Sequence, residues 1–390
     1  MHNTKILLQS TYKKTKRLVI YCFLFAILFF GATQSAECAE LDLLQMPAVV
    51  SDRAETSPLM DVKKVDNNLV AVGAWGHILY SGDMCAGWFQ AKVPVSVTMT
   101  AVYFANSMKG WAVGHDGVVL NTEDGGKTWV KQLDGNQINK LVLDQLGHVV
   151  KDKEQLLEKQ KENMTVEAQE TLAAEIEDLG YFISDSAMAL REGPTRPLID
   201  LWFKNDQEGI IVGVFGMIFN TSDGGKSWKP ILDRIENPNG YHYYGISRSG
   251  ENLFIAGEMG ILFRSKDFGE TWEQLNLPYD GSFFGVVGNQ EGTFVITFGL
   301  RGNICYSQDG GEVWQHKSIG RSSISGGTWL SDNTLCLVAV DGSIYVSPDN
   351  GETFKVLSEK FPSAIAVVQS DDDELTVVGL NGLKNIKLEK

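Results

Sequence analysis

The chain has 390 residues, of which 34 are basic and 49 acidic, so its formal net charge is −15 at pH 7. An acidic chain is repelled by phosphate backbones and anionic lipid headgroups, which excludes nucleic acid and anionic membranes as expected partners. The length fits either one large domain or two ordinary ones.

Residues 1–39 predict an export signal. Four basic residues between positions 13 and 17 precede an apolar run from Leu18 to Phe30, and small residues follow. That run is short for a bilayer span. We expect cleavage between Ala36 and Glu40, with an uncleaved anchor as the alternative. The mature chain, not itself membrane-spanning, is then expected in the periplasm or an equivalent of the thylakoid lumen.

An eight-residue pattern recurs along the rest of the chain. Thr122–Trp129 reads TEDGGKTW, related copies begin at Thr221, Ser265, Ser307 and Ser347, and a decayed copy begins at Ser81. This S/T-x-D-x-G-x-x-W pattern is the Asp box, or bacterial neuraminidase repeat. Its aspartate accepts backbone N–H bonds within a turn, its glycine supplies a positive φ, and its aromatic residue packs back onto the turn. We therefore expect structural roles for Asp83, Asp124, Asp223, Asp267, Asp309 and Asp349.

A strand–turn–strand segment precedes each box, as in VGHDGVVLNT from Val113 to Thr122. One more copy, from Val377 to Leu388, lacks a box and brings the number of modules to seven. The box aspartates lie 40 to 44 residues apart, except for one interval of 99. Modules of this length are typical of propeller blades. The sequence predicts an all-β, seven-bladed β-propeller over residues 40–390, whose last blade takes its outer strand from Met46–Ser51.

The long interval holds a segment of different composition. Gln137–Gly180 is rich in Glu, Lys, Gln, Leu and Ala, which is typical of helices. Thr165 is the expected N-cap of a second helix that ends at Gly180, after a first helix from about Asn139 to Glu162. We predict a helical hairpin inserted after blade two, within residues 135–195.

Strand direction places this insertion on one face of the ring, together with the turns between the second and third strands of each blade. The Asp boxes lie on the opposite face. Because elaborated loops carry function, we expect the insertion's face, here called the rim face, to bind a partner. Its predicted binding residues are Trp75, His115, Asp116, Arg196, Phe215, Arg234, Glu258, Met259, Arg301 and Arg321. A purely local role in a tight turn is the alternative for each of the turn residues.

The segment WAVGHDGVVLNTEDGGKTW, from Trp111 to Trp129, resembles the photosystem II stability and assembly factor family of seven-bladed propellers. The resemblance covers the chain after the signal except the insertion, which is similar to that of non-photosynthetic bacterial relatives. It implies a non-enzymatic chaperone that holds a newly made membrane-protein subunit through an arginine-rich patch. Carried over by position, the resemblance implicates Arg196, Arg234, Arg301 and Arg321.

We therefore expect an exported, non-catalytic scaffold or assembly factor that binds a protein client, in particular a membrane-protein complex. A sialidase-like glycosidase with Asp116, Glu258 or Asp341 as its acids is one alternative, although seven modules exceed the six usual in sialidases and no Tyr–Glu nucleophile pair is recognisable. A carbohydrate-binding propeller is another. Histidine and cysteine spacings predict no metal site, and no cofactor is expected.

Overall fold

The computed structural model describes residues 41–82 and 87–388. The expected export signal at residues 1–39 and the decayed box aspartate Asp83 lie outside the described residues. Within them, no helix is both long and apolar enough to cross a membrane.

Seven antiparallel sheets follow one another along the described chain, and each forms one blade. Six blades have four strands in chain order, and the last has three. Blade one consists of β1 (Leu59–Val65), β2 (Asn68–Gly73), β3 (Ile78–Ser81) and β4 (Trp88–Gln90), and blade two of β5 (Met99–Phe104), β6 (Gly110–Gly114), β7 (Val119–Thr122) and β8 (Val130–Leu133). Blade three consists of β9 (Leu198–Phe203), β10 (Gly209–Gly213), β11 (Ile218–Thr221) and β12 (Lys229–Pro230). Blade four consists of β13 (Tyr243–Ser249), β14 (Asn252–Gly257), β15 (Leu262–Ser265) and β16 (Glu273–Gln274). Blade five consists of β17 (Phe283–Gly288), β18 (Val295–Gly299), β19 (Asn303–Ser307) and β20 (Gln315–Ser318). Blade six consists of β21 (Ile324–Trp329), β22 (Leu335–Ala339), β23 (Ile344–Ser347) and β24 (Lys355–Val356). Blade seven consists of β25 (Ala364–Asp371), β26 (Glu374–Gly379) and β27 (Gly382–Lys387).

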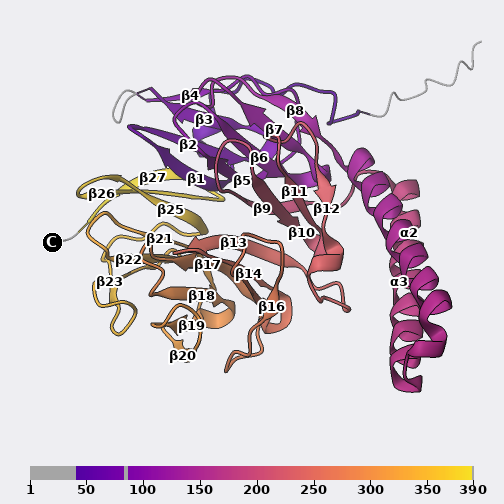
Figure 1. Ribbon diagram of the computed structural model, residues 1–390. Coiled ribbons are helices and arrows are strands. Elements are labelled where there is room, and N and C mark those ends of the chain that lie inside the picture. Colours follow the sequence, from indigo (N-terminus) through magenta and orange to yellow (C-terminus); the bar gives the residue numbers. More distant parts are fainter. Residues whose placement is uncertain (1–40, 83–86, 389–390) are drawn as a thin grey trace, which may run out of the picture. The chain divides into compact units, whose positions relative to one another are not determined.

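The first strand of every blade lies at the centre of a closed ring. Each of these strands contacts the first strand of the next blade, and β25 returns to contact β1 (Figure 1). The predicted seven-bladed propeller is therefore confirmed.

The core is divided between the blade interfaces. Seven clusters of buried apolar side chains occur in the described part of the chain, and each joins two neighbouring blades. Between blades two and three, for example, the rings of Trp111 and Phe203 stack with their centroids 3.6 Å apart. Both faces of a blade are thus buried against its neighbours, which explains why its central strands are almost entirely apolar.

Side-chain hydrogen bonds also join the innermost strands. The Asp61 carboxylate accepts the N–H of Val102 at 3.0 Å, from blade two, and the Asp200 carboxylate accepts the N–H of Ile246 at 2.8 Å, from blade four. Thr100 Oγ1 donates to the Leu198 carbonyl at 2.8 Å, from blade three. Polar groups at the centre of the ring thereby link consecutive blades.

The predicted closure of the ring was wrong. Met46–Ser51 forms no strand, and blade seven ends at β27 with three strands. The N-terminal segment instead lies beside the end of blade one, where Ala48 N–H donates to Val93 O at 3.0 Å and Ser51 N–H donates to Gln90 Oε1 at 2.9 Å. Apolar packing closes the ring, because Ala54 and Leu59 share a cluster with Val378 of β26.

The Asp boxes form satisfied turns on the face opposite the rim face. In blade five, Asp309 Oδ1 accepts Ser307 Oγ at 2.6 Å and the N–H groups of Glu312 and Val313 at 3.1 and 2.9 Å. In blade six, the matching hydrogen bonds from Thr353 lower the pKa of Asp349 to about 2. Equivalent hydrogen bonds surround Asp124, Asp223 and Asp267.

The insertion folds as two antiparallel helices, α2 (Gly135–Gln160) and α3 (Val166–Glu192), joined by a short 3-10 turn. Asp134 and Gln137 form a capping box at the start of α2, and Thr165 caps α3 as expected. The expected stop at Gly180 is wrong, because α3 continues to Glu192. Leu179, Phe182 and Ile183 pack against the cluster between blades two and three, and this contact outweighs the low helix propensity of glycine.

The hydrogen bonds of the Asp box predict the cost of losing one. We expect Asp309→Ala to lower the free energy of unfolding by about 2 kcal/mol, because two backbone N–H groups and a hydroxyl lose their acceptor. Urea denaturation would measure the change. The control is Asp206→Ala, which removes an exposed carboxylate from another turn and is expected to cost less than about 0.5 kcal/mol. Equal losses in the two variants would contradict the role assigned to the box.

Burial at the centre of the ring raises the pKa of Asp200 to about 7, against the opposing effect of Lys63. A carboxyl whose folded pKa exceeds its unfolded pKa stabilises the fold at low pH, and this stabilisation is lost as the pH rises from about 4 to about 7. We therefore expect Asp200→Asn to flatten the fall in urea midpoint between pH 5 and pH 8. An unchanged slope in the variant would show that Asp200 is not the group responsible.

Candidate functional site

Five turns of the rim face share one unusual backbone conformation. They are η2 (Ala74–Gly76), η3 (His115–Gly117), η5 (Val214–Gly216), η7 (Glu258–Gly260) and η8 (Leu300–Gly302). In each, the second residue and the glycine both have positive φ, as in type I′ turns, which favour Asn, Asp or Gly at the second position. The residues found there, with φ between 53° and 60°, are Trp75, Asp116, Phe215, Met259 and Arg301.

Turn geometry alone therefore accounts for Asp116 and not for the other four. A bulky side chain at positive φ is a strained choice, and strain of this kind gathers at functional sites. Trp75 is 64% exposed, Met259 57% and Phe215 47%. Leu300, Val340 and Leu380 add exposed apolar side chains on blades five to seven. The rim face thus presents a large apolar residue on six of its seven blades.

Three of the five strained turns are fixed to the blades that follow them. The N–H of Phe215 donates to His242 Nδ1 at 2.9 Å, and the N–H of Met259 donates to Ser282 Oγ at 3.2 Å. The N–H of Arg301 donates to Ser323 Oγ at 3.3 Å. Each acceptor directly precedes the innermost strand of the next blade. The exposed side chains consequently stand on a preorganised backbone, which reduces the entropy lost on binding.

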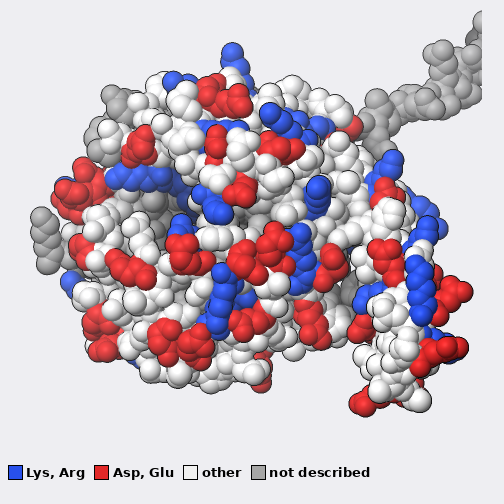
Figure 2. Space-filling model, in the orientation of Figure 1, with Lys and Arg blue, Asp and Glu red and all other residues white. Residues whose placement is uncertain are grey.

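The four arginines of the predicted patch have different surroundings. Arg196 forms an ion pair of 2.7 Å with Asp185 and retains only 12% of its side-chain exposure. Arg234 forms an ion pair of 2.8 Å with Glu270, which belongs to the Asp box of blade four. Arg301 and Arg321 are exposed on the blade-five turn and the link that follows it. Two of the four are thus paired with carboxylates and two are exposed, and acidic and basic side chains are interspersed over the face seen in Figure 2.

The polar candidates of the rim face serve local contacts. The turn of His115 and Asp116 lies against the start of α2, so closely that a Cβ on Gly135 would come 2.6 Å from the Asp116 carbonyl. Glu258 accepts the N–H of His242 at 3.3 Å. Asp341 accepts the N–H of Ser343 at 3.0 Å. The three acids considered for a glycosidase thus lie on blades two, four and six.

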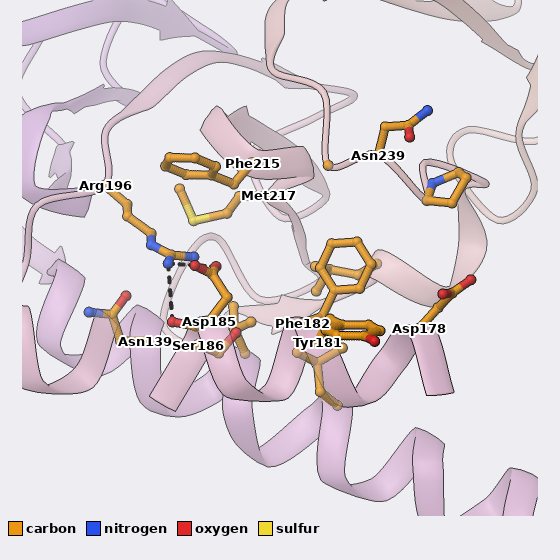
Figure 3. Close-up of a pocket in the computed structure, with 15 residues that line it drawn as sticks. Asn139, Asp178, Tyr181, Phe182, Asp185, Ser186, Arg196, Phe215, Met217 and Asn239 are labelled. Carbon is orange, nitrogen blue, oxygen red and sulfur yellow. Dashed lines mark hydrogen bonds and ion pairs between the residues drawn. The ribbon is translucent and has the colours of Figure 1, made fainter. Parts of the chain in front are cut away.

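A cleft of about 430 Å³ lies between the hairpin and blade three (Figure 3). One wall is α3, which contributes Asp178, Tyr181, Phe182 and Asp185. The opposite wall is formed by Phe215 and Met217 of blade three and by the loop that follows this blade, Pro238–Gly240. At one end, Arg196 pairs with Asp185 while its guanidinium lies 4.8 Å from the centroid of the Phe215 ring.

The sequence pointed to two of these cleft residues, Arg196 and Phe215, and missed the helical wall. The expected helix end at Gly180 assigned Tyr181 and Phe182 to a link. The available signal was that Phe182 and Ile183 continue the apolar spacing of Ile176 and Leu179 through the glycine. Arg196 and Asp185 are only 11 residues apart, but the helical wall α3 and the loop Pro238–Gly240 are more than 40 residues apart in sequence, so no local pattern could pair the two walls.

The strain in the rim turns predicts how a substitution there changes the stability of the fold. We expect Met259→Asn to raise the free energy of unfolding by about 1 kcal/mol, because asparagine tolerates the left-handed conformation better than methionine. Met259→Ala, which retains a Cβ and gains no such tolerance, is the control. Chemical denaturation measures both. A less stable asparagine variant would show that the methionine side chain contributes to the fold.

Solved structures share this fold at low sequence identity. The structure of YCF48 bound to D1 peptide is 15% identical, with a TM-score of 0.59, and the match covers 88% of this chain and 100% of that chain. YCF48 from Cyanidioschyzon merolae is 15% identical, with a TM-score of 0.57 and coverage of 88% and 98%. The WD40 β-propeller domain of Doa1 is 9% identical, with a TM-score of 0.59 and coverage of 89% and 97%. These likenesses establish the fold alone.

A search of curated protein sequences found no match. The family model described as photosynthesis system II assembly factor YCF48 does match, over residues 80–170 and 188–319. The matched residues make up more than half of the chain and include blades two to five, with the boxes of Asp124, Asp223, Asp267 and Asp309 and the rim turns of Asp116, Phe215, Met259 and Arg301. The chain therefore belongs to the YCF48 family of photosystem II assembly factors.

Proposed function

We propose that this protein is an exported, non-catalytic assembly factor that binds a protein client on its rim face. Membership of an assembly-factor family supports a protein-binding role without catalysis. A structure of YCF48 holds a D1 peptide, which makes a polypeptide the expected class of ligand. The helical insertion favours the non-photosynthetic bacterial type within the family.

The observation that carries the proposal is the set of exposed apolar side chains on strained rim turns. Trp75 and Met259 are each more than half exposed, in a conformation that disfavours them. Tryptophan and methionine are enriched in protein interfaces relative to the rest of the surface. A role in the turn itself would be served better by asparagine, so these side chains are best explained by contact with another molecule.

The client that we propose is a membrane-protein complex. The export signal expected at residues 1–39 would deliver the propeller to the compartment in which extracytoplasmic segments of membrane proteins emerge. The acidic chain favours a polypeptide client over an anionic lipid surface. Binding of an emerging segment needs a preorganised surface and no chemistry, which agrees with the fixed rim turns.

In-cell crosslinking of the tagged protein, followed by mass spectrometry, tests this function. We expect a membrane-protein partner that is lost in the double variant Trp75→Asn, Met259→Asn, even though both changes suit the fold. The matched control is Val313→Thr, which alters an exposed apolar residue on the Asp-box face to the residue found in sibling boxes. Retention of the same partners by the double variant would contradict the proposal, and a glycan as the sole captured species would favour a carbohydrate-binding propeller.

A further inference from the structure

The cleft beside the hairpin has a frame anchored in the core and carries an exposed aromatic ring on its helical wall. Ile138, Val142 and Leu146 of α2 belong to the apolar cluster between blades two and three, and Leu179 and Ile183 of α3 pack against it. The base of the hairpin is therefore part of the core. Tyr181, on the cleft side of α3, is nevertheless 69% exposed. Figure 3 shows its ring beside Phe182, with Asn239 across the cleft.

The charge of the cleft is acidic. Of its lining residues, Asp178, Asp185 and Arg196 are charged. Arg196 is neutralised by the 2.7 Å ion pair with Asp185, and it also donates to the Asp185 carbonyl at 3.3 Å. The exposed carboxylate of Asp178 on α3 therefore gives the lining of the cleft its net negative charge.

A row of aromatic rings continues from the cleft toward the centre of the propeller. Phe215 meets His242 edge to face, with centroids 4.8 Å apart. His242 is followed by Tyr244 at 6.2 Å and Tyr244 by Phe284 at 5.8 Å. Tyr244 and Phe284 lie on the innermost strands β13 and β17, and both are partly exposed. The row thus steps across blades three, four and five.

A second carboxylate stands beside this row. Glu258 Oε2 lies 3.8 Å from His242 Nδ1 and accepts the backbone N–H of His242. The apolar path from Tyr181 to Phe284 therefore has one acidic side chain on the hairpin and another along the ring. Aromatic faces and carboxylates together favour apolar side chains accompanied by cations, and they repel acidic ones.

We propose that the hairpin cleft and this aromatic row bind an extended segment of the client in which apolar side chains are flanked by lysine or arginine. The inference rests on the proposed function and names the class of segment recognised. An extended chain can follow an open cleft and a row of rings, with apolar side chains against Tyr181 and Phe215 and basic side chains beside Asp178 and Glu258. The attraction also agrees with the acidic balance of the whole chain.

Fluorescence polarisation with labelled synthetic peptides tests the recognition. The probe is the nonapeptide GSKLFLKSG, compared with GSELFLESG, in which both lysines become glutamate, and GSKSSSKSG, in which the apolar residues become serine. We expect the purified protein to bind the first peptide at least tenfold more tightly than either of the others, with the advantage over the glutamate peptide shrinking as salt is raised. Equal binding of the three peptides overturns the inference.

Two hairpin variants locate the site. Asp178→Lys is expected to remove the preference for the lysine peptide, and Tyr181→Ser to weaken its binding at least fivefold. Both residues are exposed, so the fold is expected to survive, which circular dichroism checks. The control is Asp152→Lys, which makes the same charge change at an exposed position of α2 outside the cleft. An unchanged preference in Asp178→Lys, or an equal change in Asp152→Lys, overturns the proposed site.

The crosslinking readout separates this inference from the proposed function. If the cellular partner is retained in the hairpin variants and lost in the Trp75→Asn, Met259→Asn variant, the rim face binds the client and the cleft does not recognise the segment. If no protein partner is found with any variant, the proposed function itself fails, whatever the peptides show.

Discussion

A four-stranded blade has two apolar faces, and neither can be buried within the blade. Each must be covered by a neighbouring sheet, and only a closed ring covers both faces of every sheet. The seven interface clusters are the result of this requirement, and the rest of the molecule depends on it. The ring fixes which turns share a face, so a binding surface can be assembled from residues that lie more than 200 positions apart in the chain.

The turns on the two faces of the ring satisfy their backbone hydrogen bonds in different ways. On one face, the Asp-box carboxylates satisfy the backbone of each turn within a few residues, as Asp309 does with Glu312 and Val313. On the other, the turns of Phe215, Met259 and Arg301 bond to the next blade and carry side chains that their own geometry disfavours. The first arrangement serves stability, whereas the second leaves side chains available for contact.

Local patterns in the sequence were sufficient for the blades and for the rim turns. The Asp box and the preceding Gly-x-x-Gly turn each act within about ten residues, so counting them predicts seven blades and aligns Trp75, Phe215, Met259 and Arg301. The closing strand could not be predicted, because it depends on whether the N-terminal segment prefers β27 or the Gln90 side chain and the Val93 carbonyl. The helical wall of the cleft differs, because Gly180 predicts a stop while the apolar spacing that continues through Phe182 and Ile183, together with packing of α3 against blades two and three, carries the helix past it.

The manner of ring closure affects how the propeller responds to force. Blade one and blade seven remain separate sheets, joined by side chains such as Leu59 and Val378 and by the close approach of Gly382 to the Glu55 carbonyl. No strand from one end of the described chain is hydrogen-bonded into the sheet at the other end. The ring is therefore closed by packing and not by a shared sheet. Tension between blades one and seven acts on short-range contacts, which break over a small displacement. We therefore expect a pull between blades one and seven to open this seam before it separates the strands of a blade.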